Sequence, residues 1–572
     1  MKVYFLILNL CVVVILSLND SKIDKEIQFI IKKDNNNLLR NLKGNLKPVK
    51  SENQNINENI IELDPDYFIT QISWTKNEKY DLNYLFGIFE GSNDSSFKNP
   101  IPIAMIKNKD NFSKMNYINI STPNSYKYIR YIPPNRNNSD IFPIKIIGHE
   151  ISEELNLKEK KLFQATNLPL ISIYTENLAN ISQNGEEVNC NVLIINEGKV
   201  QTKETATIKV RGRSTAHASD KKPYRLKFTT QQKVLNFKGD YKKWNLMANT
   251  FDRSLLRNSL AFKISELFEF EYTPRCVPVD LLLNGNFRGN YYICDHMDVG
   301  KNRINISKLE KTDIDEPNIS GGYFMEIDGR SNSGKHFKTD KGIYIKINEP
   351  SEEEITPEQE KYIINKVNKF EDEIYNGILD SIDLDSYSKF FIVEEFSADV
   401  DFLYSSFYFI KKRNDDLFYF GPIWDFDLAF DNDRRLIPTN EKPEFSFNYC
   451  GSSGTMRNFT KVLLGNKKVI GYIQKTWEKL SNTVLNENIL LDFIEEKEKY
   501  LKESSELNFL KWDNYVSESS GRGGRGGRGG GGFGLGRKGE NFEESVEVVK
   551  NYVKLRFESL SNLINNALSL AK

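Results

Sequence analysis

The spacing of apolar residues changes near residue 350, and this change limits the folds open to the chain. Before it, short alternating runs such as YFITQISW and YRLKFTT are separated by turn residues, a pattern that predicts β-strands. After it, TPEQEKYIINKVNKFEDEIYNGI and most of residues 466–570 carry apolar residues at helical spacing. Thr356, Pro357 and Gln359 form a helix-start signal in the first of these segments. The pattern therefore predicts a strand-rich part followed by a largely helical part.

Composition limits the partners of the protein. The chain has 572 residues, 39% of them apolar and 12% aromatic, which is enough for several hydrophobic cores. Its formal net charge is −1, so it lacks the basic field with which dedicated nucleic-acid or anionic-membrane binders attract their partners. We expect no nucleic-acid partner.

The N-terminus has the pattern of a targeting segment. One lysine precedes an apolar run in MKVYFLILNLCVVVILSLND, which favours a signal peptide over residues 1–18, with a signal anchor as the alternative. We expect a secreted protein, extracellular or in the cell wall, with no transmembrane segment after cleavage. Residues 19–63 are polar and predict a disordered leader. A second flexible segment is predicted at residues 519–539, where glycine and arginine predominate.

Four cysteines remain after such a cleavage, and two of them flank a predicted hairpin. Cys276 and Cys294 are equidistant from Gly285. A three-residue turn centred on Gly285 would place them opposite each other, whereas a two-residue Asn-Gly turn would displace the register. The sequence leaves both possibilities open.

Residues 64–150 predict an all-β sandwich. Their words LFGIFEGSNDSSF, YKYIRYIPP and IKIIGHE resemble the discoidin-like, galactose-binding jelly-roll family. The resemblance implies a domain that binds glycans through its loops. A sandwich that serves only as a spacer fits the pattern equally well.

One helix is predicted among the strands that follow. FDRSLLRNSLAFKISELFEF has an apolar stripe at helical spacing, and Asp252 is the predicted cap of its N-terminus.

Four acids mark the strongest candidate for chemistry. Asp399 and Asp401 precede a predicted hairpin, and Asp425 and Asp427 end it, among the apolar residues of FYFGPIWDFDLAF. Carboxylates are costly to bury in such surroundings unless they are neutralised. A hairpin brings its ends together, so Asp401 and Asp425 are expected to approach each other. Such a group suits Mg²⁺, which binds one or two carboxylates together with phosphate oxygens, and one acid is free to act as a base.

A basic segment offers the complementary half of a phosphate site. In KVRGRSTAHASDKKPYRLKF, Arg211, Arg213 and Ser214 lie in a Gly-containing turn that can approach phosphates. In the strand that follows, Arg225 and Lys227 alternate with apolar residues, so that one face packs and the other presents cations. Taken singly, each of these cations also fits an ordinary solvated face.

The order of several motifs is similar to that of the CotH kinase family. The motifs are RGRST…KKPYRLKF, WNLMANTFDRSLLRNSLAFKISE, VDLLLNGNFRGNYYI, GGYFMEID, YIKINEP and ADVDFLYSSFYFIKKRNDDLFYFGPIWDFDLAF. The resemblance spans residues 165–570 and implies an α+β fold, a reduced and atypical form of the protein-kinase fold. It further implies transfer of the ATP γ-phosphate, with Mg²⁺ or Mn²⁺, to Ser or Thr hydroxyls of secreted or cell-surface proteins.

The resemblance also implies roles for individual residues. Asp401 takes the catalytic position, and Asp425 and Asp427 take the metal positions. Lys222 and Lys227 are both candidates for the phosphate-facing lysine. Ser406 stands where the family often has a metal-binding Asn, and Asp399 stands where it often has another Asn.

These departures keep a second interpretation open. A kinase-like frame without catalysis can serve as a cell-surface or cell-wall binding protein, such as an adhesin. The three acids Asp401, Asp425 and Asp427 favour the enzyme, whereas Ser406 favours the binding protein.

Overall fold

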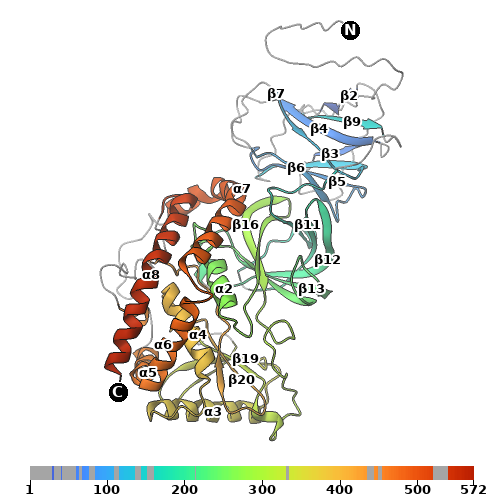
Figure 1. Ribbon diagram of the computed structural model, residues 1–572. Coiled ribbons are helices and arrows are strands. Elements are labelled where there is room, and N and C mark those ends of the chain that lie inside the picture. Colours follow the sequence, from blue (N-terminus) through green and yellow to red (C-terminus); the bar gives the residue numbers. More distant parts are fainter. Residues whose placement is uncertain are drawn as a thin grey trace, which may run out of the picture. The chain divides into compact units, whose positions relative to one another are not determined.

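The chain divides into two compact units, Met1–Lys161 and Leu162–Lys572, and each is described by itself. The predicted signal peptide, the Gly/Arg-rich residues 520–538, Arg213 and Cys450 lie outside the described residues. The computed structural model describes residues 29–30, 40–41, 59–63, 67–75, 84–107, 115–134, 144–150, 160–183, 185–212, 214–329, 334–433, 444–448, 454–519 and 539–571 (Figure 1).

The N-terminal unit is all-β, as predicted. Its two larger sheets are antiparallel, with strand orders β3-β8-β5-β6 and β7-β4-β9. Apolar side chains from both sheets, among them Ile72, Phe89 and Ile129, form one core. The strands are β1 (Phe29–Ile30), β2 (Arg40–Asn41), β3 (Asn59–Glu62), β4 (Tyr67–Thr75), β5 (Ile88–Ser92), β6 (Ile101–Met105), β7 (Met115–Asn119), β8 (Tyr128–Ile132) and β9 (Ile144–Glu150).

The second unit begins with a closed β-barrel, which the strand pattern did not reveal. The barrel closes because β10 pairs in parallel with β15, in the order β10-β11-β12-β13-β14-β16-β15. Alternate residues such as Tyr224, Leu226 and Phe228 point into its apolar interior. Its strands are β10 (Leu170–Thr175), β11 (Val188–Asn196), β12 (Lys199–Val210), β13 (Tyr224–Gln232), β14 (Tyr241–Met247), β15 (Cys276–Leu283) and β16 (Asn286–Asp295).

The hairpin of β15 and β16 resolves the cysteine question. Its turn is the two-residue Asn284-Gly285 type, with φ of 51° and 72°. A β-bulge between Leu281 and Leu282 restores the register, so that Cys276 faces Cys294 and the two form a disulfide. The sequence signalled the turn but not the bulge that compensates for it.

A five-stranded sheet follows, in the order β18-β19-β17-β20-β21. Its two faces differ in character. Ile327, Ile345, Phe407 and Phe409 lie on the apolar face with Phe370 of helix α3. The strands are β17 (Tyr323–Ile327), β18 (Lys335–Lys338), β19 (Tyr344–Glu349), β20 (Phe407–Lys411) and β21 (Phe418–Phe420).

Helices form the rest of the second unit. The capping box predicted at Thr356 is present at the start of α3. Helix α4 packs against α6 and α8, and α7 packs against α8 and the barrel strand β16 (Figure 1). Among the described residues, no helix combines the length and apolarity needed to span a membrane. The helices are α1 (Ser214–Ala218), α2 (Arg257–Leu267), α3 (Pro357–Tyr375), α4 (Leu384–Ser397), α5 (Gly454–Gly465), α6 (Lys467–Ser481), α7 (Glu487–Ser519) and α8 (Phe542–Leu570).

The predicted N-cap of α2 is wrong. The helix begins at Arg257, its N-cap is Leu256, and a turn at Arg253 and Ser254 precedes it. The Asp252 carboxylate nevertheless accepts the backbone N–H of Arg257 at 2.9 Å. It satisfies a free donor of the first helical turn from outside the cap position.

Candidate active site

Five carboxylates converge where the barrel meets the segment that follows β21. Burial raises the pKa of Asp427 well above its ordinary value, and neighbouring negative charges raise it further. In decreasing order of effect, those charges belong to Asp425, Asp252, Asp399 and Asp401. The charges of Asp399 and Asp401 therefore act on Asp427 in the loop after β21, and Asp252 acts there from a distant part of the chain.

Asp399 and Asp401 are positioned by the end of α4. Ala398 stops the helix with a left-handed backbone, at φ 49°. Asp399 is buried, and its carboxylate accepts the backbone N–H of Asp401 at 3.2 Å. This turn fixes the backbone at Asp401, whose side chain is only partly buried.

The loop after Trp424 carries the other two acids. Asp425 is exposed and adopts φ 76°, a left-handed conformation that is uncommon outside glycine. The backbone N–H of Phe426 donates to the side chain of Asn258 in α2 at 2.8 Å. The N–H of Phe430 donates to the carbonyl of Ser397 at the end of α4, at 2.7 Å. Two helices therefore hold the loop on both sides of Asp427.

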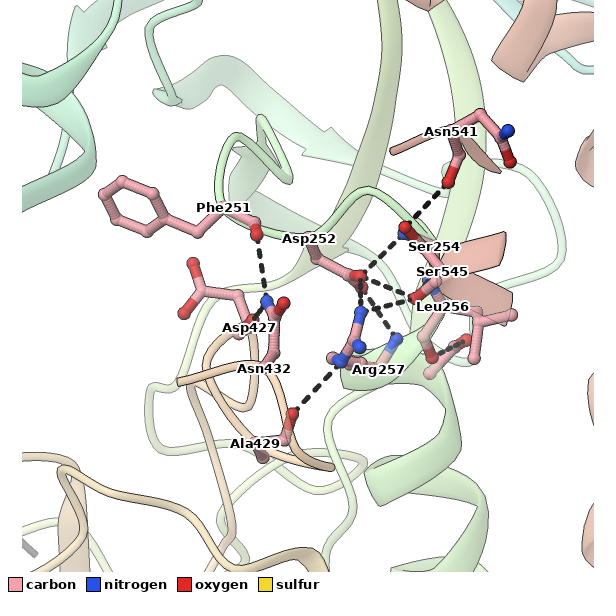
Figure 2. Close-up of polar contacts among 11 residues, drawn as sticks. Phe251, Asp252, Ser254, Leu256, Arg257, Asp427, Ala429, Asn432, Asn541 and Ser545 are labelled. Atoms are coloured by element: carbon pink, nitrogen blue, oxygen red, sulfur yellow. Dashed lines mark hydrogen bonds and ion pairs between the residues drawn. The ribbon is translucent and has the colours of Figure 1, made fainter. Parts of the chain in front are cut away.

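Figure 2 shows the contacts that tie this loop to the segment before α2. The side-chain amide of Asn432 donates to the carbonyls of Asp427, at 2.6 Å, and Phe251, at 2.9 Å. The buried Arg257 donates from Nε to the carbonyl of Ala429 at 3.0 Å (Figure 2). Hydrogen bonds to backbone groups thus hold the loop. These bonds do not involve the carboxylate of Asp427.

Asp252 differs from the other acids because it has its own cation. Its carboxylate forms a buried ion pair with Arg257 and accepts the N–H of Ser254 at 2.9 Å (Figure 2). A buried carboxylate with this many donors is satisfied within the fold. We assign Asp252 to the support of the loop and not to cation binding.

The polar face of the five-stranded sheet borders the acids. Burial raises the pKa of Tyr408 on β20 well above its ordinary value, and the charges of Glu326 and Asp425 add to the effect. Burial likewise raises the pKa of Glu326 on β17. Ser406 adopts φ 63°, and its N–H donates to the Glu326 carboxylate at 3.3 Å. Ser406, at the position where the family often has Asn, therefore lies beside the largely buried carboxylate of Glu326.

Cations from the outer face of the barrel approach the same region. Burial lowers the pKa of Arg211. The charge of Asp425 opposes that shift more strongly than the charge of any other acid. The Arg211 guanidinium also lies 5.7 Å from the centre of the Trp424 ring. Burial lowers the pKa of His296 well below its ordinary value, with further lowering from Lys243 and Arg225. The basic and acidic halves expected from the sequence therefore share one electrostatic environment.

The remaining sequence-predicted cations are placed differently. Lys222 donates from Nζ to the carbonyl of Ala216 in α1 at 2.6 Å. This bond ties the chain after α1 back to that helix. Lys227 is exposed on the outer face of β13. Arg213 and the side chain of Ser214 lie outside the described part of the chain, so their proposed phosphate contacts remain predictions.

The donor set fits a hard divalent cation that arrives with phosphate. Within the described residues, no three acidic, imidazole or thiol groups form a metal-binding cluster by themselves. Mg²⁺ is usually held by one or two carboxylates plus substrate phosphates and seldom by an all-protein cage. Asp425 and Asp427 would supply these oxygens, and a cation there would relieve the repulsion that raises the pKa of Asp427.

Comparison with protein families decides the relationship. The model of the family described as CotH kinase protein matches residues 208–560, which include the barrel strands β13–β16, the sheet and all the acids. The chain belongs to the CotH kinase family. The protein is therefore kinase-like, and its second unit contains the matched region.

Two further comparisons add little to this assignment. No curated protein matches the chain. Among solved structures, CBM62 from Clostridium thermocellum Xyl5A is similar over 17% of this chain and 81% of its own, with 18% identity and a TM-score of 0.14. That score is too low to support an argument about the N-terminal unit.

Sequence reasoning missed several residues of this CotH site. Glu326 lies within the motif GGYFMEID, and an acid at an alternating position between apolar residues was the available signal. Tyr408 looked like one more aromatic residue of an apolar strand. Arg257 and Asn258 were not singled out in the sequence, and both are buried and hydrogen-bonded to the acid loop.

Proposed function

We propose that this CotH kinase family member transfers the γ-phosphate of ATP, with Mg²⁺ or Mn²⁺, to Ser or Thr hydroxyls of secreted or cell-surface proteins. One observation carries the proposal: Asp427 is surrounded by carboxylates while the Arg211 guanidinium lies in the field of Asp425. Such a combination suits a metal-bound polyphosphate, which brings both positive and negative charge.

Each residue has a defined part in this reaction. Asp401 accepts the proton of the acceptor hydroxyl, whose oxygen forms a bond to the γ-phosphorus while the bond to the bridging oxygen breaks and ADP leaves. Asp425 and Asp427 would hold the cation, which would neutralise charge on the phosphates. Arg211 donates to phosphate oxygens. The fixed turn between Asp399 and Asp401 keeps the base in place.

Nucleotide binding and phosphate transfer by the purified chain test the proposal. Wild-type protein should bind ATP only with Mg²⁺ or Mn²⁺ and should label a protein acceptor or itself. Asp401→Asn should keep metal-dependent ATP binding, since the base does not hold the cation, and should lower transfer by about 10²–10⁴-fold. Asp425→Ala should abolish both metal-dependent ATP binding and phosphate transfer. Absence of ATP binding by the wild type under all metal conditions would overturn the proposal.

The N-terminal unit favours a second candidate function, glycan binding. Tyr117 of β7 is 62% exposed. On the neighbouring positions, Gln71 donates from its side-chain amide to Asn119 at 3.0 Å. An exposed ring beside paired amides suits a sugar, which offers C–H groups for stacking and hydroxyls for hydrogen bonds. Tyr117→Ala should abolish binding on a glycan array if the unit has this function, while leaving ATP binding unchanged.

A further inference from the structure

We propose that Lys346 is the phosphate-facing lysine of the site and that Glu326 positions it. The inference rests on the proposed function and deepens it, because it assigns the lysine to the five-stranded sheet. The family resemblance pointed instead to Lys222 or Lys227, near the start of β13 in the barrel.

The strand register places these two side chains next to each other. Lys346 of β19 is the direct cross-strand partner of Glu326 of β17, and Glu326 is the direct partner of Tyr408 of β20. Direct partners have side chains on the same face of a sheet. The Lys346 Nζ lies 4.0 Å from the Glu326 carboxylate, and both side chains are partly shielded, with exposures of 26% and 12%.

The face that carries this row is opposite the face that packs on α3. Residues next to each member of the row, namely Ile345, Ile327 and Phe407, lie on the apolar face with α3. Because side chains alternate along strands, the row occupies the opposite face. On that face Asn348 also donates to Glu326, at 3.3 Å, so the carboxylate is held in place.

The row connects to both halves of the active site. Glu326 and Asp425 both act on the Arg211 guanidinium and on the Tyr408 hydroxyl. Ser406, at the position where the family often has Asn, donates its N–H to Glu326. A lysine anchored to Glu326 is therefore placed beside the region where the metal-bound phosphates would lie.

The barrel lysines do not share these features. The Nζ of Lys222 is engaged with a backbone carbonyl of its own loop. Lys227 is exposed, and its charge acts on Lys209 along the outside of the barrel.

A nucleotide acyl phosphate tests the assignment, since it labels lysines beside bound phosphates. The amine attacks the acyl carbonyl, a C–N amide bond forms, the C–O bond to the phosphate breaks, and ATP leaves while the amine proton goes to solvent. We expect peptide mass spectrometry of the full chain to find the label on Lys346, and excess ATP with Mg²⁺ to suppress it. Label on Lys222 or Lys227, with Lys346 unmodified, would overturn the inference.

Binding constants provide an independent readout. Lys346→Met should weaken ATP binding by about 10-fold or more, because a charge-assisted contact is lost. Binding of adenosine, which has no phosphates, should not change. Lys227→Met is the matched control and should leave both constants unchanged. Glu326→Gln should reproduce part of the Lys346→Met effect, because the lysine loses its anchor.

The outcomes also separate this inference from the proposed function. If wild-type protein neither binds ATP with metal nor shows ATP-protected label, the proposed function fails, and the inference fails with it. If wild type binds ATP and Lys346→Met binds equally well, only the inference fails.

Discussion

Asp427 is the residue at which stability and proposed function oppose each other. Its carboxylate is crowded by four others, and burial and repulsion raise its pKa well above the ordinary value. The free energy of unfolding therefore falls as the pH rises from about 3.9, where an unfolded aspartate titrates, through the higher pKa in the fold. Under the proposed function, the bound cation would neutralise this group.

Replacement of Asp427 should reveal this opposition. Without metal at neutral pH, Asp427→Asn should raise the midpoint of thermal unfolding, by roughly 2–4 °C for each gain of about 1 kcal/mol. The increase should shrink as the pH is lowered toward 4, where the wild-type carboxyl is protonated. Stabilisation by Mg²⁺ with nucleotide should be lost. Differential scanning fluorimetry across pH measures all three effects.

Asp425→Asn is the control for this experiment. Asp425 is exposed but is the neighbouring charge with the largest effect on the pKa of Asp427, so the same substitution should raise the metal-free midpoint by less than Asp427→Asn does, while still removing the metal effect. Equal metal-free midpoints for wild type and Asp427→Asn at all pH values would contradict the interpretation of Asp427.

At the scale of elements, the C-terminal helix α8 supports the end of α4, which leads into Asp399 and Asp401. Arg556 of α8 donates from Nε to the carbonyl of Glu395 in α4 at 2.9 Å, and Tyr552 donates to the carbonyl of Phe396 at 2.8 Å. These carbonyls belong to the last turn of α4, from which Asp399 and Asp401 emerge. The Glu395 carboxylate, 3.3 Å from Arg556, also accepts the N–H of Phe447 at 3.0 Å.

Loss of this arginine should be costly. Arg556→Met leaves the buried Glu395 carboxylate without its cation, and the expected loss in unfolding free energy is about 3–5 kcal/mol. Lys550→Met on the same helix is the control: its pair with Glu498, at 2.8 Å, is partly exposed, so the expected loss is under about 1 kcal/mol. Urea denaturation measures both, and equal losses would contradict the role of Arg556.

At the scale of the molecule, each unit has its own hydrophobic core. The N-terminal core is built from the strands of that unit alone, and the second unit contains the barrel interior and the large core of sheet and helices. The disulfide between Cys276 and Cys294 and the candidate active site both belong to the second unit. Units with separate cores unfold as separate cooperative transitions.

Calorimetry of the full chain should therefore show at least two transitions. Reduction of the disulfide should lower only the one that belongs to residues 162–572, by about 3 kcal/mol for a loop of this length. Mg²⁺ with ATP should raise the same transition. A single transition that includes the unfolding of both units, and that responds to both treatments, would show that the units are coupled.

Local sequence was sufficient to predict the elements and the most important acids. Alternation along β13 identified its buried face, the capping box located the start of α3, and the hairpin between Asp401 and Asp425 predicted their approach. These features depend on side-chain direction and hydrogen bonds within a few residues, which the sequence records directly. The family resemblance supplied the role expected of each acid.

Only the tertiary structure decided which distant residues meet. Closure of the barrel depends on the pairing of β10 with β15, and the disulfide register depends on a bulge. Burial of Arg257 against Asp252 and the placement of Lys346 beside Glu326 depend on contacts between elements. The sequence shows that each of these residues is charged, but its partner is set by strand register and packing, which no local pattern encodes.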